Sequence, residues 1–439
     1  MTNRLPSGMT LPQRLSDVDA GFLTRLLHAH GAIAPENRIV DVSESDVGMT
    51  AGYFSAIKRM KCTYREPTDA PSSFIVKAWP DFEMAPPETI AEMFARDIKG
   101  YLFDEDRFYP RPRVFLADFD SRQNRWALIM EDACTFAEQK LHEQEMGMDE
   151  VERMIPRLVE LALTWEGCDQ GGKARQLDAL DVDHWASDAN LSTYRNIMPG
   201  GARLFDIVSA MPDSSLVRGR TWDRMLGPEF AELFTRKLDA FYGAVKPDSG
   251  ATCTLAHGDL RGDNLFFSEP SAAYPHGWLT IDFQLLFRGP VPSDLAYLLN
   301  SASVLPEVYS GDNRDHVLRS FYDGFMAGTR TYPDYTWDQF LEEYAVMSTV
   351  LFVYFVGFGA AVYQAALNDE QPMRVELGPR GDTEADLAAD ELRKRMWWRK
   401  TFANFSTTFK EFGLYDRLSA LPENTSHMGE WFEPPSTPT

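Results

Sequence analysis

The chain has 439 residues, of which 44% are hydrophobic and 13% aromatic, so it is too long for one small domain and can fill large cores. Its 66 acidic and 43 basic residues give a formal charge of −23, and a field of that sign repels nucleic-acid phosphates and anionic lipid. We therefore expect no nucleic-acid partner. Four scattered cysteines without a C-x-x-C pair, and no apolar leader, favour a reduced, cytoplasmic protein.

The first third of the chain is rich in strand-like runs. A short amphipathic helix is expected over residues 16–30, with Ser16 as its N-cap and Gly31 as its stop. Helical spacing recurs over residues 86–103. Apolar runs separated by turn residues predict strands at 38–43, 53–64, 72–80, 113–119 and 125–132.

After about residue 133 the pattern becomes helical. Helices are expected over 148–165 and 228–245, strand-like patches interrupt them near LAHGDL and WLTIDF, and helical spacing continues to about residue 416. The Pro/Ser/Thr-rich tail is expected to be loosely ordered. The sequence thus predicts an α+β fold with a strand-rich N-lobe (1–133) and a larger helical C-lobe (134–439).

Residues 345–368 carry no charge and are long enough to span a bilayer. Ser348, Thr349, Gly357, Gly359 and Gln364 interrupt the apolar run, and the flanking charges are acidic rather than basic. A buried core helix is the favoured interpretation, and a membrane span is the alternative, so we expect no membrane span.

Two segments combine polar residues with short apolar strands: LAHGDLRGDNLFF (255–267) and WLTIDFQLLFRGPVPSDLAYLL (278–299). Asp259 precedes Asn264 by five positions, and Asp282 ends an apolar strand. A carboxylate can accept the proton of an alcohol that attacks a phosphate, and Mg²⁺ prefers hard oxygen ligands such as a carboxylate and an amide. The order and spacing are those of kinases, although two ordinary polar turns beside strands are the alternative.

The HGDLRGDN segment resembles the H-G-D-x4-N loop of the aminoglycoside phosphotransferase and choline kinase superfamily, and IDFQ with DLAYLL is most similar to its ecdysteroid kinase-like branch. The resemblance runs from about residue 45 to about 370. It implies a protein-kinase-like two-lobed fold, ATP and Mg²⁺ as cofactors, and a small-molecule alcohol as phosphate acceptor. By this resemblance Asp259 is the catalytic base, Arg261 offsets charge on the transferred phosphate, and Asn264 and Asp282 hold magnesium.

The resemblance also assigns supporting roles. His257 braces the catalytic loop, Asp294 anchors the loop backbone, and Asp263 is only solvated. In the N-lobe, Lys77 pairs with the nucleotide phosphates, and Asp97 is its acidic partner although the family usually has Glu; Glu92 is the alternative.

Further nucleotide contacts are implied in the N-lobe. Gly48 and Gly52 belong to the phosphate-covering loop, and the backbone of Glu131 and Ala133 contacts adenine at the hinge, which Asp132 braces. Each of these assignments has a structural alternative. Lys77 could be an ordinary edge-strand lysine, and Asp97 or Glu92 could lie on a solvated helix face. The segment with Gly48 and Gly52 could be a plain hairpin turn, and residues 125–133 a plain buried strand with its exit turn.

The sequence therefore predicts an ATP-dependent phosphotransferase that acts on a hydroxyl of a small molecule. The alternatives are a catalytically silent kinase-fold binding protein, a protein kinase, which the absence of D-F-G and A-P-E motifs disfavours, and a membrane protein. Trp397 and Trp398 could line the acceptor pocket, although core burial is their favoured role. The acidic balance suits an amine-bearing acceptor and the aromatic content an apolar alcohol, and the sequence does not choose between them.

Overall fold

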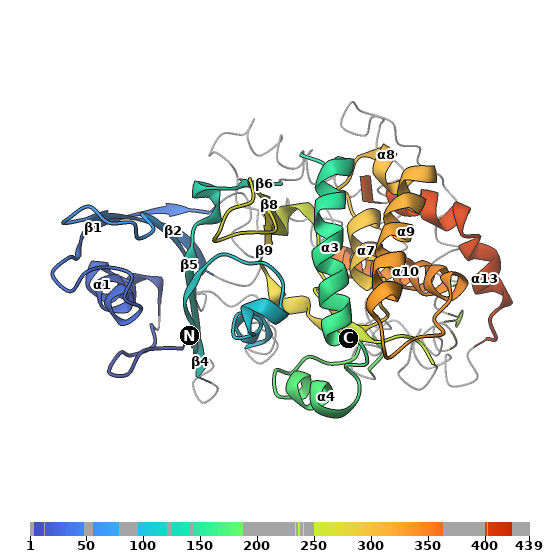
Figure 1. The fold of residues 1–439 in the computed structure, drawn as a ribbon, viewed down its shortest axis with the longest axis horizontal. Coiled ribbons are helices and arrows are strands. Elements are labelled where there is room, and N and C mark those ends of the chain that lie inside the picture. The colour runs from blue at the N-terminus through green and yellow to red at the C-terminus, as the bar shows by residue number, and fades with distance from the viewer. Residues whose placement is uncertain are drawn as a thin grey trace, which may run out of the picture.

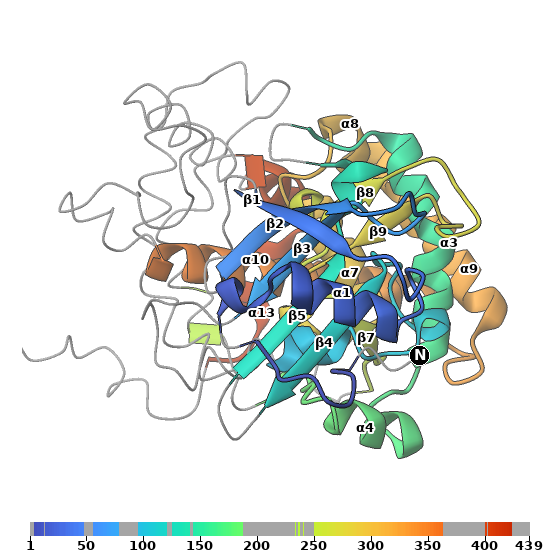
Figure 2. The same cartoon turned by 90° about the vertical axis from the view of Figure 1, so that its left-hand side faces the viewer.

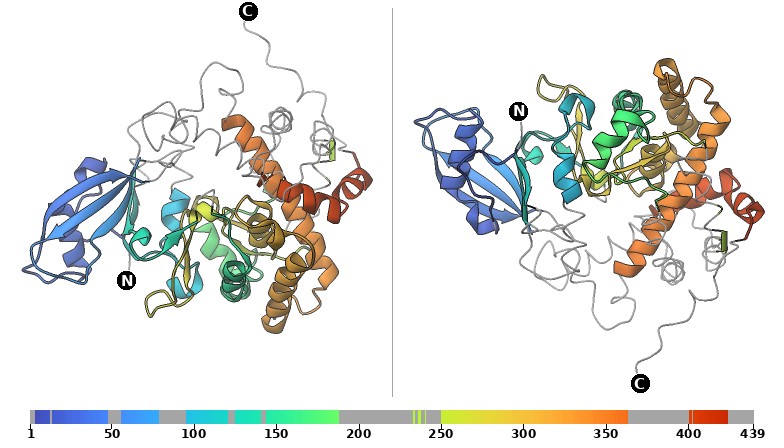
Figure 3. Two further views of the ribbon diagram at one scale, coloured as in Figure 1. Left: turned by 90° about the horizontal axis from the view of Figure 1, so that it is seen from above. Right: turned by 90° about the horizontal axis from the view of Figure 1, so that it is seen from below.

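The computed structural model describes residues 4–12, 14–47, 56–78, 95–120, 125–140, 144–187, 233, 236–237, 240, 250–362, 400–401 and 403–423. A five-stranded sheet lies at one end of the molecule and a mainly helical part at the other (Figure 1, Figure 3). The predicted helix at 228–245 lies largely outside the described residues, as does the tail beyond residue 423.

The N-terminal sheet has the strand order β1-β2-β3-β5-β4, and every neighbouring pair is antiparallel. Its strands are β1 (Ile39–Asp46), β2 (Ala56–Tyr64), β3 (Ser73–Ala78), β4 (Val114–Asp120) and β5 (Arg125–Glu131). All six residues of the central strand β3 are buried, and Lys77 in this strand is paired with Ile57 on one side and Leu128 on the other. This central position excludes the alternative of an edge-strand lysine.

Helix α1 (Ala20–Ala29) lies across the face of the sheet that points away from the helical part (Figure 2). Because side chains alternate along a strand, Phe74 and Val76 pack with α1, while Ile75 joins the core shared with the helical part. The helix begins at Ala20 because the Asp19 carboxylate accepts a 2.6 Å hydrogen bond from the Phe22 N–H. The predicted start at Ser16 is therefore wrong.

The helical part has one large core. α3, predicted over 148–165, spans those residues and buries its apolar face at intervals of three or four residues, from Val151 to Trp165. It packs against α9, and α7 packs against α10. The described helices here are α3 (Met148–Trp165), α4 (Gly171–Asp178), α7 (Ser293–Asn300), α8 (Pro306–Tyr309), α9 (Gly311–Gly328), α10 (Trp337–Val362) and α13 (Leu414–Ala420).

Helix α10 contains most of the uncharged segment. Ala345, Met347, Val350 and Leu351 are each at most 3% exposed and belong to the main core, as expected of a buried core helix. None of the helices in the described ranges combines the length and the apolarity that a bilayer span requires.

The α+β architecture, with a strand-rich N-terminal part and a larger, mainly helical C-terminal part, confirms the predicted fold class. The last strand of the sheet ends at Glu131, and a short 3-10 helix, η3 (Ala133–Thr135), connects it to the rest of the chain. The division into lobes of residues 1–133 and 134–439 stays a prediction.

Candidate active site

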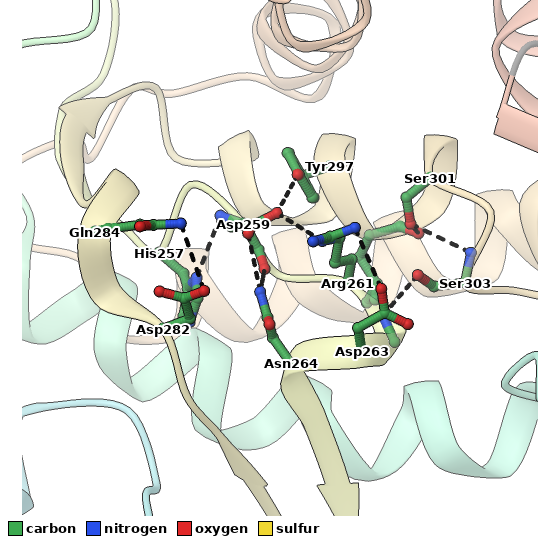
Figure 4. Close-up of polar contacts among 12 residues, drawn as sticks. His257, Asp259, Arg261, Asp263, Asn264, Asp282, Gln284, Tyr297, Ser301 and Ser303 are labelled. Carbon is green, nitrogen blue, oxygen red and sulfur yellow. Dashed lines mark hydrogen bonds and ion pairs between the residues drawn. The ribbon is translucent and has the colours of Figure 1, made fainter. Parts of the chain in front are cut away.

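Two antiparallel strand pairs bring the two polar motifs together. β7 (Thr254–Ala256), which precedes the HGDLR loop, pairs with β10 (Phe287–Gly289), which follows the IDFQ segment. β8 (Leu265–Phe267), which leaves the loop, pairs with β9 (Trp278–Thr280). The Ile281 N–H also donates a 3.1 Å hydrogen bond to the Asn264 carbonyl. The start of β8 and the end of β9 are thus adjacent, which places Asn264 next to the Asp282 segment (Figure 4).

Helix α7 anchors the backbone of the catalytic loop through Asp294. Its carboxylate accepts hydrogen bonds from the N–H groups of His257, at 3.0 and 3.1 Å, and Gly258, at 3.3 Å, and from the Tyr109 hydroxyl. Burial raises the pKa of Asp294, although the nearby His257 and these hydrogen bonds oppose the shift. The predicted anchoring role of Asp294 is confirmed.

His257 and Gly258 fix the start of the loop. The His257 Nε2 lies 3.1 Å from the Ile281 carbonyl, which can only accept, so Nε2 carries the hydrogen and Nδ1 accepts from the Asp259 N–H at 3.2 Å. Burial lowers the pKa of His257, which favours this neutral form. Gly258 has φ +80°, and a Cβ there would come within 2.1 Å of the Leu285 carbonyl oxygen. His257 therefore braces the loop, as predicted, and position 258 requires glycine.

The Asp259 side chain is held by two hydrogen bonds and an ion pair. Its Oδ2 accepts a 3.0 Å hydrogen bond from Asn264 Nδ2, which also donates to the Asp259 carbonyl at 2.9 Å. Its Oδ1 lies 3.0 Å from the Nε of Arg261 and accepts from the hydroxyl of Tyr297. Figure 4 shows the three side chains meeting Asp259 from different directions. Asp259 is 5% exposed, so its carboxylate has one fixed orientation.

Arg261 makes a second ion pair within the loop. Its Nη1 lies 3.2 Å from the Asp263 Oδ2, and the Asp263 side chain is 16% exposed. The Gln139 side chain donates a 2.7 Å hydrogen bond to the Asp263 carbonyl. The prediction that Asp263 is only solvated is wrong, because the arginine two positions earlier turns toward it.

Asp282 and Asn264 offer oxygen atoms suited to a metal ion. The Asp282 side chain is 25% exposed. Among the described residues its side chain contacts Lys77 Nζ and Gln284 Nε2, and both distances are long at 3.4 Å. The two amide hydrogens of Asn264 point at Asp259, so its carbonyl oxygen is the atom left to act as a ligand. A lightly held carboxylate and an amide oxygen fit the chemistry of Mg²⁺, with phosphate oxygens and water completing its shell.

Lys77 and Asp97 form a buried ion pair beside Asp282. The distance from Lys77 Nζ to Asp97 Oδ2 is 2.7 Å, and Asp97 is fully buried. Burial opposes the charged lysine, but the Asp282 and Asp97 carboxylates outweigh it, and the pKa of Lys77 is raised. Asp97 Oδ1 also accepts a 2.8 Å hydrogen bond from the Phe283 N–H. The aspartate therefore reaches the lysine although it is shorter than the glutamate usual in the family.

The hinge residues lie at the end of β5. The Ala133 carbonyl accepts hydrogen bonds from the N–H groups of Phe136, at 3.1 Å, and Ala137, at 2.8 Å, so its own N–H is the group left for a ligand. The Glu131 side chain accepts from the Tyr274 hydroxyl at 2.9 Å. Glu131 and Tyr274 both line a surface cavity of about 1320 Å³, and Lys77 is not part of that lining.

Asp132 braces this hinge. Its carboxylate accepts hydrogen bonds from the Ser73 hydroxyl at 2.7 Å, the Arg59 Nε at 2.6 Å and the Cys134 N–H at 3.2 Å. Strands β2 and β3 are thus tied to the segment that leaves β5, as the predicted bracing role requires.

Several predicted residues lie outside the described ranges: Gly48, Gly52, Glu92, Trp397 and Trp398. The structure brings together Lys77, Asp97, Asp259, Arg261, Asn264 and Asp282. Sequence reasoning gave Tyr297 no role, although it lies in the DLAYLL segment, three residues after Asp294 and on the same face of a helix.

Comparisons with known proteins found one family model and a set of solved structures that are similar to this chain. Residues 175–331, which contain both motifs, match the model of the Ecdysteroid kinase-like family. This match confirms the resemblance that HGDLRGDN and IDFQ indicated. No curated protein matches the chain.

Similar solved structures include aminoglycoside 2'-phosphotransferase-IIIa in a GDP complex. It shares 14% identity over 87% of this chain and 98% of its own, with a TM-score of 0.43. The ethanolamine kinase of Plasmodium vivax shares 10% identity over 85% of this chain and 88% of its own, with a TM-score of 0.45. A choline/ethanolamine kinase family protein from Mesorhizobium loti shares 10% identity over 90% of this chain and 100% of its own, with a TM-score of 0.40.

Proposed function

We propose that this protein is an ATP-dependent phosphotransferase that moves the γ-phosphate to a hydroxyl group of a small molecule. The observation that carries the proposal is that the two parts of the molecule bring Lys77, Asp282, Asn264 and Asp259 together at one place. Lys77 of the sheet contacts Asp282 at 3.4 Å, and the neighbouring strand pair sets Asn264 and Asp259 beside it. The match of residues 175–331 to the Ecdysteroid kinase-like family supports the same conclusion.

The nucleotide is proposed to bind between the hinge and Lys77. The Ala133 N–H would meet the adenine edge, and the Lys77 ammonium would contact the phosphates. Asp97 holds that ammonium at 2.7 Å in a buried position, so the cation is in place before the nucleotide arrives. A charge fixed in advance stabilises developing negative charge without a cost of reorganisation.

Asn264 and Asp282 are proposed to hold Mg²⁺ together with the phosphates. The bound ion would neutralise charge on the phosphate oxygens. The residues fit this ion because one carboxylate and one amide oxygen lie on adjacent backbone segments, and neither is tightly held by another group in the described part of the chain.

Asp259 is proposed to orient the acceptor hydroxyl and to accept its proton. His257 does not compete for this role, because burial lowers its pKa and its ring is used within the loop. Arg261, already beside Asp259, is proposed to offset charge that develops on the phosphate.

The experiment is ATP consumption against a mixed library of amino sugars, choline-like amines, steroids and macrolides, with mass detection of a phosphate adduct. Asp259→Asn should reduce turnover by about 10²- to 10⁴-fold and leave ATP affinity, measured by calorimetry, unchanged. Asp178→Asn is the control, because this carboxylate is exposed and pairs with Arg288 away from the site. Full turnover in Asp259→Asn would reject the role of Asp259, and ATP binding by the wild type without any adduct would favour a silent binding protein.

A further inference from the structure

We propose that Oδ2 of Asp259 is the oxygen that meets the acceptor hydroxyl, and that Tyr297 is a positioning residue that reserves it for this role. The proposal rests on the phosphotransferase function argued above. It names the oxygen that accepts the proton of the alcohol and a residue of the DLAYLL segment, to which the resemblance assigns no role, that determines which oxygen this is.

The hydrogen-bond inventory of Asp259 carries the inference. An ionised carboxylate offers about four acceptor positions, two on each oxygen. Oδ1 accepts a hydrogen bond from the Tyr297 hydroxyl and forms an ion pair with Arg261, whose Nε lies 3.0 Å away. Oδ2 is occupied once, by Asn264 Nδ2 at 3.0 Å. Within the described part of the chain, the position that remains is on Oδ2, the oxygen turned toward Asn264, which is the proposed metal ligand.

The helix that carries Tyr297 explains how this arrangement is maintained. Asp294 and Tyr297 lie three residues apart on α7 and therefore share one face. Asp294 holds the N–H groups of His257 and Gly258, and Tyr297 holds the side chain of the next residue, Asp259. One helix face thus fixes three consecutive residues of the loop, in both backbone and side chain. Figure 4 shows the contact between Tyr297 and Asp259.

Tyr297 acts through Asp259 and not on the substrate. Its side chain is buried, with 2% of the residue exposed, and its hydroxyl donates to the carboxylate. Without this donor, Oδ1 would keep only the Arg261 contact, and the carboxylate could rotate so that either oxygen faces the acceptor. A reacting group that samples wrong orientations lowers the rate of the chemical step and leaves nucleotide binding unaffected.

Tyr297→Phe tests the inference, because it removes the hydroxyl and keeps the ring that fills the core. With ATP and the best acceptor from the library, kcat should fall about 10- to 100-fold. The KM for ATP, the calorimetric affinity for ATP with Mg²⁺ and the Tm should stay close to wild type. Tyr344→Phe is the matched control: it is fully buried in α10, and its hydroxyl lies 3.4 Å from Asn300. Its kcat should stay within about twofold of wild type.

A second variant keeps the test decisive if Tyr297→Phe fails to fold. Arg261→Lys keeps the positive charge beside the phosphate but removes the planar guanidinium that forms the ion pair with Oδ1, so kcat should fall while the KM for ATP is unchanged. An unchanged kcat in Tyr297→Phe, or a parallel loss of kcat, ATP affinity and Tm in both tyrosine variants, would overturn the positioning role. A wild-type protein without turnover on any acceptor would instead reject the proposed function, and the inference with it.

Discussion

The two aspartates of the site, Asp259 after β7 and Asp282 after β9, are held in opposite ways. Asp259 is 5% exposed, and its carboxylate accepts hydrogen bonds from Asn264 and Tyr297 and forms an ion pair with Arg261. The Asp282 side chain is 25% exposed and has two contacts of 3.4 Å. A group that must aim an alcohol gains from a fixed orientation, whereas a metal ligand needs lone pairs that no protein donor already uses.

The backbone shows the same contrast. The Asp259 N–H is held by the His257 ring in a loop anchored by α7, whereas Asp282 has φ +70°, which side-chain-bearing residues rarely adopt. Such a conformation costs about 1–3 kcal/mol and persists only where the surroundings impose it. Here the Asp282 N–H donates to the Tyr101 hydroxyl at 3.2 Å, and the next N–H, of Phe283, donates to Asp97.

The largest expected effect follows from the loss of the Asp282 charge. Asp282→Asn should reduce turnover by about 10³-fold at any Mg²⁺ concentration, because an amide is a weaker ligand for a hard cation. Its Tm should stay near that of wild type, since Asn also tolerates positive φ. Asp282→Ala should lose the same activity and in addition lower the Tm. Turnover that recovers fully in Asp282→Asn at high Mg²⁺ would contradict a direct role in catalysis.

The next largest effect is expected at Lys77, the cation that contacts both Asp97 and Asp282. Lys77→Met leaves Asp97, which is fully buried, without its ion-pair partner at 2.7 Å. An uncompensated buried charge costs about 3–5 kcal/mol, so the urea midpoint should fall and ATP binding should be lost. Lys77→Arg keeps the charge and should lose less stability. Equal urea midpoints for wild type and Lys77→Met would show that the pair does not support the fold.

A glycine explains how the short Asp97 side chain reaches its partners. A Cβ on Gly100 would lie 2.5 Å from the Cβ of Phe283, so the helix at residues 95–100 packs directly against the Asp282 segment. Gly100→Ala should push the two apart and destabilise the protein by about 1–3 kcal/mol. Gly172→Ala in α4, where the nearest atom is 3.9 Å away, is the matched control and should leave the stability unchanged or raise it by up to about 1 kcal/mol in the same urea titration. An equally neutral Gly100→Ala would reject this close packing.

Sequence patterns identified what is local in this site and missed what depends on packing. Asp259 and Asn264 are close in the chain, so one motif predicts both. The Tyr297 hydroxyl reaches Asp259 from a separate helix, and nothing in the spacing alone specifies that contact. The close packing at Gly100 and the turn of Arg261 toward Asp263 are likewise set by tertiary structure. The sheet was predictable because its strands alternate or run apolar between turn residues, but the start of α1 depended on which side chain caps it.

A buried glutamate, Glu343, holds the residues that precede β7, the strand that leads to Asp259. Glu343 accepts hydrogen bonds from the Thr252 N–H, at 2.6 Å, and from the Thr252 and Tyr335 hydroxyls, both at 2.5 Å. Burial raises its pKa above 4.5, so the folded state binds this proton more tightly than the unfolded state. Stability from this group is therefore greatest at low pH and falls as pH rises through the raised pKa.

Comparison with Glu343→Gln isolates this contribution. The difference in unfolding free energy between wild type and variant should shrink as pH rises above 4.5, by at most about 1.4 kcal/mol per pH unit, since the amide does not titrate. Urea unfolding of both proteins between pH 4.5 and pH 7 measures it. A difference that grows with pH would show that the three hydrogen bonds outweigh burial and that the pKa is lowered instead.

The smallest effect is expected at Asp263, and it decides what holds Arg261. The Arg261–Asp263 pair is partly exposed, with side chains 20% and 16% accessible, and such pairs contribute about 0–1 kcal/mol. Asp263→Asn keeps the carbonyl that Gln139 contacts, and Arg261 keeps its 3.0 Å contact with Asp259. The kcat should therefore fall less than about fivefold, with the KM for ATP unchanged. A loss as large as that expected for Tyr297→Phe would mean that Asp263 orients Asp259 through Arg261, and the tight hold on the base would then originate in the loop itself and not in α7.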